Sequence, residues 1–114
     1  MGKLTSHVLD VAAGIPAAGL RIELHELASA RLLGQFRTSQ DGRCAALLEG
    51  EAMRVGRFSL TFYVAEYFRA AGMKLPEPPF VDDVVVRFGI ADPAQNYHVP
   101  LIVSPWSYST YRGS

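Results

Sequence analysis

Residues 57–64 read RFSLTFYV, and in this stretch polar and apolar side chains alternate at every position. The same period of two returns in LRIELH at residues 20–25 and in DVVVRFGI at residues 83–90. Such alternation is typical of a β-strand that turns one face to a hydrophobic core. The sequence therefore predicts a fold built mainly from strands.

Turn-forming residues separate these stretches, as in AGIP at residues 13–16 and SQDG at residues 39–42. The spacing of about eight strands is typical of an all-β sandwich or barrel. We expect them near residues 4–11, 19–27, 32–38, 43–49, 56–64, 83–90, 95–103 and 105–112. One stretch departs from this pattern: residues 65–71, AEYFRAA, are rich in helix formers and precede Gly72, which predicts one short helix.

Length and composition restrict the class of protein. A chain of 114 residues with 49% hydrophobic residues is expected to form a single domain over residues 1–114, with a packed core. Eleven basic and eleven acidic side chains cancel, so nucleic acid is not an expected partner. The uncharged stretch at residues 96–111 contains two prolines and many hydroxyls, so we expect no membrane span.

The expected compartment is the cytoplasm. A single cysteine, Cys44, rules out an internal disulfide framework and fits a reducing environment. The first ten residues, MGKLTSHVLD, contain no apolar signal region. The periplasm is the alternative if a signal peptide precedes this sequence.

The last two predicted strands are rich in aromatic residues: Tyr97, Trp106, Tyr108 and Tyr111. Exposed apolar surface and unpaired sheet edges are typical of an interface between subunits. We therefore expect an oligomer built in part by edge pairing. The alternative is that these rings cap the core of a monomer.

Two of the three histidines, His7 and His98, fall in the middle of predicted strands. Such positions are held rigidly, and histidine titrates near neutral pH, so both are candidates for a general base. Judged by spacing alone, a histidine at such a position is more often a hydrogen-bonded surface or interface residue than a catalytic one. His25 lies on the polar side of its strand beside Glu23, and we expect no role for it.

A metal site is not expected. Two histidines on separate strands could hold zinc with a carboxylate as the third ligand. Asp10, however, is three residues from His7, so in a strand its side chain faces the opposite way.

Arg43 follows the turn formed by Asp41 and Gly42. It is either a solvated strand end or a fixed guanidinium that can bind a carbonyl or a flat nitrogen heterocycle. Strand alternation sends the neighbouring Cys44 to the other face, where we expect a small buried side chain and not a nucleophile.

The C-terminal residues 106–114, WSYSTYRGS, are strand-like almost to the end, so they form either a tail or the last wall of a pocket. If the last two strands form a hairpin around Ser104 and Pro105, two sets of side chains can line one surface. These sets are His98, Pro100, Ile102 and Ser107, Ser109, Tyr111.

Several motifs together resemble the transthyretin-like family, and they cover almost the whole chain. They are TSHVLD at residues 5–10 with GIPA at 14–17, SQDGRC at 39–44, PF at 79–80, VVVRF at 84–88, YHVPL at 97–101 and SPWSYSTYRGS at 104–114. One branch of this family carries thyroid hormone, and the other hydrolyses 5-hydroxyisourate.

The sequence resembles the hydrolase branch, which has histidine in the first strand, arginine after the Asp-Gly turn, histidine in the penultimate strand and a terminal Tyr-Arg-Gly-Ser. The matching residues here are His7, Arg43, His98 and Tyr111 to Ser114. The hormone carriers lack this set. Tyr63 departs from the acidic residue common at its position, away from the candidate site.

The resemblance implies a transthyretin-like sandwich of two four-stranded sheets with one short helix. It also implies a homotetramer, a dimer of dimers, whose active sites lie in a channel at the dimer–dimer interface. No metal or cofactor is implied. The expected substrate is a small molecule, 5-hydroxyisourate, an intermediate of urate degradation and purine metabolism.

The resemblance further implies a hydrolysis that opens the N1–C6 amide of 5-hydroxyisourate to give 2-oxo-4-hydroxy-4-carboxy-5-ureidoimidazoline. His98, together with His7, would act as the general base, and Arg43 would orient the ring and stabilise the oxyanion. Tyr111 would contact the substrate ring, and Ser114 would position water or a histidine. The alternatives are a non-catalytic carrier of a small aromatic ligand and a monomeric structural sandwich.

Overall fold

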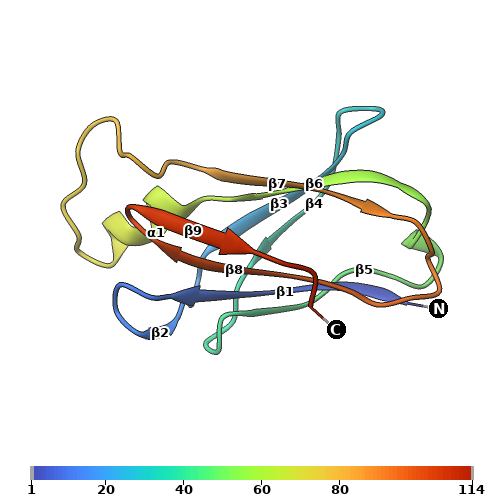
Figure 1. The fold of residues 1–114 in the computed structure, drawn as a ribbon, viewed down its shortest axis with the longest axis horizontal. Coiled ribbons are helices and arrows are strands. Elements are labelled where there is room, and N and C mark those ends of the chain that lie inside the picture. Colours follow the sequence, from blue (N-terminus) through green and yellow to red (C-terminus); the bar gives the residue numbers. More distant parts are fainter. Residues whose placement is uncertain (1, 114) are drawn as a thin grey trace.

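The computed structural model describes residues 2–113, and within them nine strands form two sheets that face one another (Figure 1). The first sheet has the order β5-β1-β8-β9, and the two-residue strand β2 also pairs with the end of β1. The second sheet has the order β4-β3-β6-β7. The strands of the first sheet are β1 (Lys3–Asp10), β2 (Ile15–Pro16), β5 (Arg43–Glu49), β8 (Tyr97–Ser104) and β9 (Ser107–Thr110). Those of the second are β3 (Arg21–Glu26), β4 (Arg31–Arg37), β6 (Gly56–Phe62) and β7 (Val84–Ile90).

Strand alternation divides each sheet into an inner and an outer face. In β1, Leu4 and Val8 are fully buried, whereas Thr5 and His7 lie on the outer face and keep part of their surface in solvent. The inner faces of both sheets meet in one hydrophobic core, whose largest buried side chains are Phe58, Phe62 and Phe68. The outer face of the first sheet is thus left free to carry polar groups.

The helix α1 (Val64–Ala70) closes one end of the sandwich (Figure 1). Val64, Ala65 and Phe68 are its buried residues. The helix ends before Gly72, whose positive φ of 92° suits a glycine, and the amide of Met73 donates to the carbonyl of Phe68 at 3.0 Å. A short 3-10 turn, η1 (Gly50–Ala52), leads from β5 to β6.

The predicted sandwich with one short helix is confirmed, and eight of its strands lie close to the predicted ranges. Strand β2 was not predicted, because two residues are too few to show alternation. The last strand is shorter than predicted: β9 ends at Thr110, whereas residues 105–112 were expected. Pro100 lies opposite the residue after Thr110, and because proline has no N–H it cannot continue the hydrogen-bonded ladder there. The Thr110 hydroxyl donates instead to the Pro100 carbonyl, at 2.7 Å.

The expectation that Tyr97 contributes to the aromatic surface is wrong. Its side chain is buried, with 6% of its surface exposed, and its hydroxyl accepts hydrogen bonds from the amides of Ala91 and Asp92 at 3.1 Å. Trp106, Tyr108 and Tyr111 are exposed as expected.

Candidate active site

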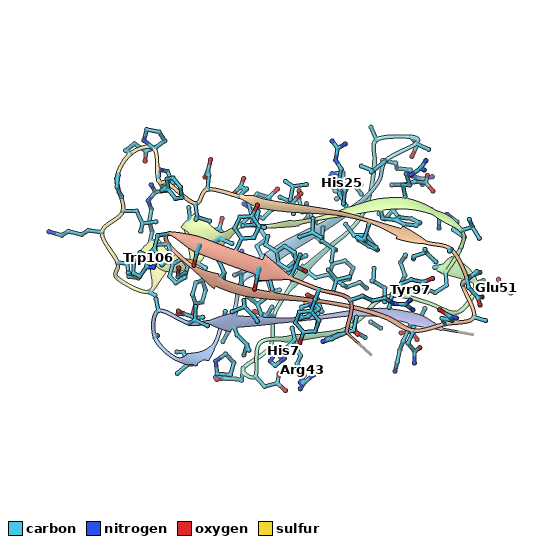
Figure 2. The ribbon with its side chains drawn as sticks, viewed as in Figure 1. His7, His25, Arg43, Glu51, Tyr97 and Trp106 are labelled. Atoms are coloured by element: carbon cyan, nitrogen blue, oxygen red, sulfur yellow. The ribbon has the colours of Figure 1, made fainter. Side chains whose placement is uncertain are left out.

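The pairing of β1 with β5 brings His7 and Arg43 together. The two residues are direct cross-strand partners in this antiparallel pair. Directly opposed side chains lie on the same face of a sheet. Figure 2 shows His7 and Arg43 side by side, on the side of the sandwich that faces away from the second sheet.

The turn of residues 39–42 fixes the start of β5 and therefore the place of Arg43. Gly42 has a φ of 80°, and a Cβ atom there would come within 2.5 Å of the Val8 carbonyl oxygen, so only glycine fits. The Ser39 hydroxyl donates to the Asp41 carboxylate and lowers its pKa. This carboxylate lies 3.6 Å from Nε of Arg43 and forms an ion pair with the guanidinium.

The same turn also holds His7. Its Nε2 lies 2.9 Å from the backbone carbonyl oxygen of Asp41. Because a carbonyl can only accept, Nε2 of neutral His7 carries the proton and Nδ1 has the lone pair. His7 and Arg43 are therefore both positioned by one turn.

Strand β8 supplies His98 from the other side of β1. The two strands run parallel, with Thr5 opposite His98 and His7 opposite Pro100, so His98 lies on the same outer face as His7. Nδ1 of His98 is 2.8 Å from the hydroxyl of Thr5. Two imidazoles and one guanidinium from three neighbouring strands thus share one surface.

The C-terminal segment packs directly against His98. The Gly113 amide donates to the His98 carbonyl at 2.8 Å, which continues the register of β9 beyond Thr110. A Cβ atom on Gly113 would lie 2.5 Å from Cδ2 of the imidazole and 3.1 Å from Cγ. Glycine is therefore required here for close approach to the ring, at a backbone position next to the candidate base.

The electrostatics of the site favour a neutral His98. Burial of the ring, followed by electrostatic interaction with His7 and Arg43, lowers the pKa of His98 below its usual value of 6.5. The contact with Thr5 acts in the opposite direction. Because a neutral imidazole can accept a proton, His98 is suited to act as a base at neutral pH.

The structure brings together three of the five residues predicted from the sequence: His7, Arg43 and His98. Tyr111 is 59% exposed and lines a different hollow of about 380 Å³, between the edges of the two sheets, beside Phe88 and Val99. Ser114 lies outside the described residues.

Sequence reasoning missed Thr5, whose hydroxyl contacts His98, whereas Gly113 fell within the C-terminal segment 111–114 that it singled out. Thr5 has the same strand parity as His7, so its placement on this face was available from the alternation. Its contact with His98 depends on the parallel register of β1 and β8, which no local pattern indicates.

Asp10 and Cys44 face away from the site, as the alternation predicts. Asp10 is buried and accepts hydrogen bonds from the Tyr67 hydroxyl and the Ala13 amide, both at 2.9 Å. Burial raises the pKa of the Cys44 thiol, which disfavours the reactive thiolate. In the part of the chain that the structure describes, no three His, Cys, Asp or Glu side chains are grouped as metal ligands.

Neither helix within residues 2–113 has the length and apolar character of a membrane span.

Comparison with known proteins gives a full-length match. A family profile described as "HIUase/Transthyretin family" matches residues 4–113. A protein named 5-hydroxyisourate hydrolase from Ralstonia nicotianae is 56% identical over 117 residues, an alignment that covers 100% of this chain and 100% of that protein.

Solved structures share the fold. A structure described as (S)-allantoin synthase superposes with a TM-score of 0.94 at 48% identity, covering 99% of this chain. This chain spans 44% of that longer protein. A sea bream transthyretin in complex with thyroxine superposes with a TM-score of 0.87 at 22% identity, over 97% of this chain and 94% of that one, which is a likeness of fold.

Proposed function

The chain belongs to the HIUase/transthyretin family, and on that premise we propose that it is a hydrolase that acts on 5-hydroxyisourate. The full-length identity of 56% to a protein named for this activity supports the proposal. The observation that carries it is the grouping of His7, Arg43 and His98 on one outer sheet face. A plain carrier of an aromatic ligand has no need for two imidazoles beside a guanidinium.

The proposed reaction is a hydrolysis without a covalent enzyme intermediate. Nε2 of His98 takes a proton from water while the water oxygen bonds to C6 of the substrate. The C6–N1 bond then breaks, and N1 receives the proton that His98 took. One water is consumed, and the ring opens to 2-oxo-4-hydroxy-4-carboxy-5-ureidoimidazoline.

Arg43 is proposed to bind the oxygen on C6, where negative charge develops during the attack. A fixed guanidinium can donate two parallel hydrogen bonds to such an oxygen and its neighbours. His7 is proposed to contact the substrate next to Arg43. Because Tyr111 lines a separate hollow of the protomer, we propose that it contacts the ring only in the assembled oligomer, and that Ser114 positions water or a histidine.

We propose that the protein assembles as a homotetramer, a dimer of dimers. Trp106, Tyr108 and Tyr111 are all more than half exposed, with 63%, 52% and 59% of their surface in solvent. Strands β7 and β9 are the last strands of their sheets, and exposed edges of this kind pair readily with another chain. The cytoplasmic location stays a prediction, supported by the single buried cysteine.

The activity is tested by the decay of freshly prepared 5-hydroxyisourate in the ultraviolet, with and without the purified protein. We expect the rate of decay to rise in proportion to protein concentration and to be unchanged by a chelator. Decay equal to that in buffer would reject the hydrolase. Tight substrate binding without turnover would favour the carrier, and inhibition by the chelator would indicate a metal site.

The pH profile should reflect the lowered pKa of His98. Only the neutral imidazole can act as a base, so activity is retained above its pKa and lost as the pH falls through it. Because burial, His7 and Arg43 hold this pKa below 6.5, kcat/KM should keep more than half of its plateau at pH 6.5 and fall in more acidic buffer. A half-maximal point above pH 6.5 would contradict this assignment.

Gly113→Ala should impair the enzyme through the position of the His98 ring. The new methyl group would lie 2.5 Å from Cδ2, so the imidazole or the C-terminal segment must move. A displacement of about 1 Å in a catalytic group can cost up to about 10²-fold in rate, and we expect a loss in kcat of that order. Gly56→Ala is the matched control, because its Cβ would meet only ordinary contacts at 3.4 Å. Equal kcat in the two variants would remove the steric argument.

A further inference from the structure

We propose that Thr5 is a positioning residue for His98: its hydroxyl holds the proton of the imidazole on Nδ1 and so presents the Nε2 lone pair to the attacking water. The inference rests on the proposed hydrolase function for its catalytic meaning. The placement of the proton, however, can be tested without substrate.

The geometry of the pair is fixed by the sheet. Thr5 and His98 are direct partners in the parallel ladder of β1 and β8, which runs through seven consecutive residue pairs. The Thr5 hydroxyl oxygen lies 2.8 Å from Nδ1 of His98, a normal hydrogen-bond length, and both residues are partly buried. On the other side of β8, the Gly113 amide binds the His98 carbonyl at 2.8 Å. Because the backbone of His98 is held from both sides, its ring can change position only by rotation about the side-chain bonds. The Thr5 hydroxyl opposes that rotation.

The direction of the hydrogen bond follows from the role of the ring in the proposed reaction. A hydroxyl can donate or accept, so the 2.8 Å contact alone permits either tautomer of His98. Because Nδ1 faces the Thr5 hydroxyl, Nε2 is the ring nitrogen left to take a proton from water. Nε2 can do so only when Nδ1 carries the proton of the neutral ring, and the hydroxyl then accepts from Nδ1.

His7 provides a contrast on the same face. Its Nε2 donates to the Asp41 carbonyl, so its lone pair lies on Nδ1. His98 is held in the other tautomer, with its lone pair on Nε2, the nitrogen at the far end of the ring from the backbone. The two imidazoles are thus distinguished by their partners, and Thr5 is the residue that makes His98 the base.

Replacing Thr5 by valine tests the proposal, since valine keeps the shape of threonine and lacks the hydroxyl. We expect kcat to fall about tenfold, the loss that corresponds to one hydrogen bond of about 1.4 kcal/mol, while KM changes little. Thr5→Ser keeps the hydroxyl and should restore most of kcat. Thr61→Val, near the end of β6 in the other sheet, is the matched control and should behave as the unaltered protein.

The proton position is read from the ¹⁵N chemical shifts of His98 in the substrate-free protein. We expect a protonated Nδ1 and an unprotonated Nε2 in the unaltered protein, and a mixture of tautomers in Thr5→Val. A predominantly Nε2-protonated His98 in the unaltered protein would overturn the proposal, whether or not the protein is active. Wild-type kcat in Thr5→Val, or a Thr5→Ser variant as impaired as Thr5→Val, would also overturn it. Failure of the unaltered protein to hydrolyse 5-hydroxyisourate would reject the proposed function and leave the tautomer result to stand by itself.

Discussion

Replacing Arg43 by methionine should lower kcat by about 10²–10³-fold, the usual cost of removing one fixed donor from a developing oxyanion. Methionine keeps much of the length of the side chain but has neither the charge nor the donors. Since Arg43 starts β5 and is more than half exposed, the fold should tolerate the change. The measurement is the initial rate of 5-hydroxyisourate decay, with circular dichroism and size-exclusion chromatography to verify folding and assembly.

The matched control for this variant is Arg57→Met, which removes an exposed arginine from β6 in the other sheet. It should leave kcat unchanged. Arg43→Lys should recover only part of the lost rate, because an ammonium restores the charge but not the planar fork of donors. If Arg43→Met and Arg57→Met had the same kcat, Arg43 would have no part in the reaction.

Removal of the Arg43 charge should also alter the pH profile. The positive charge of Arg43 lowers the pKa of His98, so Arg43→Met raises that pKa. The neutral base is then lost at higher pH than in the unaltered protein, and the acid limb of kcat/KM moves toward neutrality. This shift links the guanidinium to the imidazole through the rate itself. An unchanged acid limb would show that another group controls it.

The strands and the face on which each side chain lies could be predicted from the sequence, because both follow from a local period of two. That alternation places His7 on the outer face of its strand and turns Asp10 and Cys44 inward. The place of Arg43 at the start of β5 follows from the Asp-Gly turn before it. Local rules sufficed for these residues because each concerns only its own strand.

Contacts between strands could not be predicted in this way. That Thr5 meets His98 depends on the register of β1 and β8, strands separated in sequence by most of the chain. The partners of the Tyr97 hydroxyl are two amides of the preceding loop, and strand alternation does not indicate them. The need for glycine at position 113 appears only when the ring of His98 is placed beside it. For such positions the resemblance of motifs indicated that they matter, and the geometry provides the physical reason.

The largest effect is expected from His98→Asn. Asparagine can still bind the Thr5 hydroxyl, but it cannot accept a proton at neutral pH, so general-base catalysis is lost and kcat should fall about 10²–10⁴-fold. The substrate contacts from Arg43 and His7 are retained, so KM should change far less than kcat. The rate is measured with the ultraviolet assay, and light scattering should show the same assembly as in the unaltered protein.

His25→Asn provides the control for this variant, since His25 lies in β3 on the opposite side of the molecule (Figure 2). It should retain full activity, which separates the loss of a base from the general cost of replacing a histidine. His7→Asn tests the assignment of roles. Nε2 of His7 is bound to the main chain at Asp41, so its replacement should act mainly on KM through weaker substrate binding. A greater loss of kcat in His7→Asn than in His98→Asn would reverse the two roles, because the group that takes the proton must be the one whose removal slows the chemical step most.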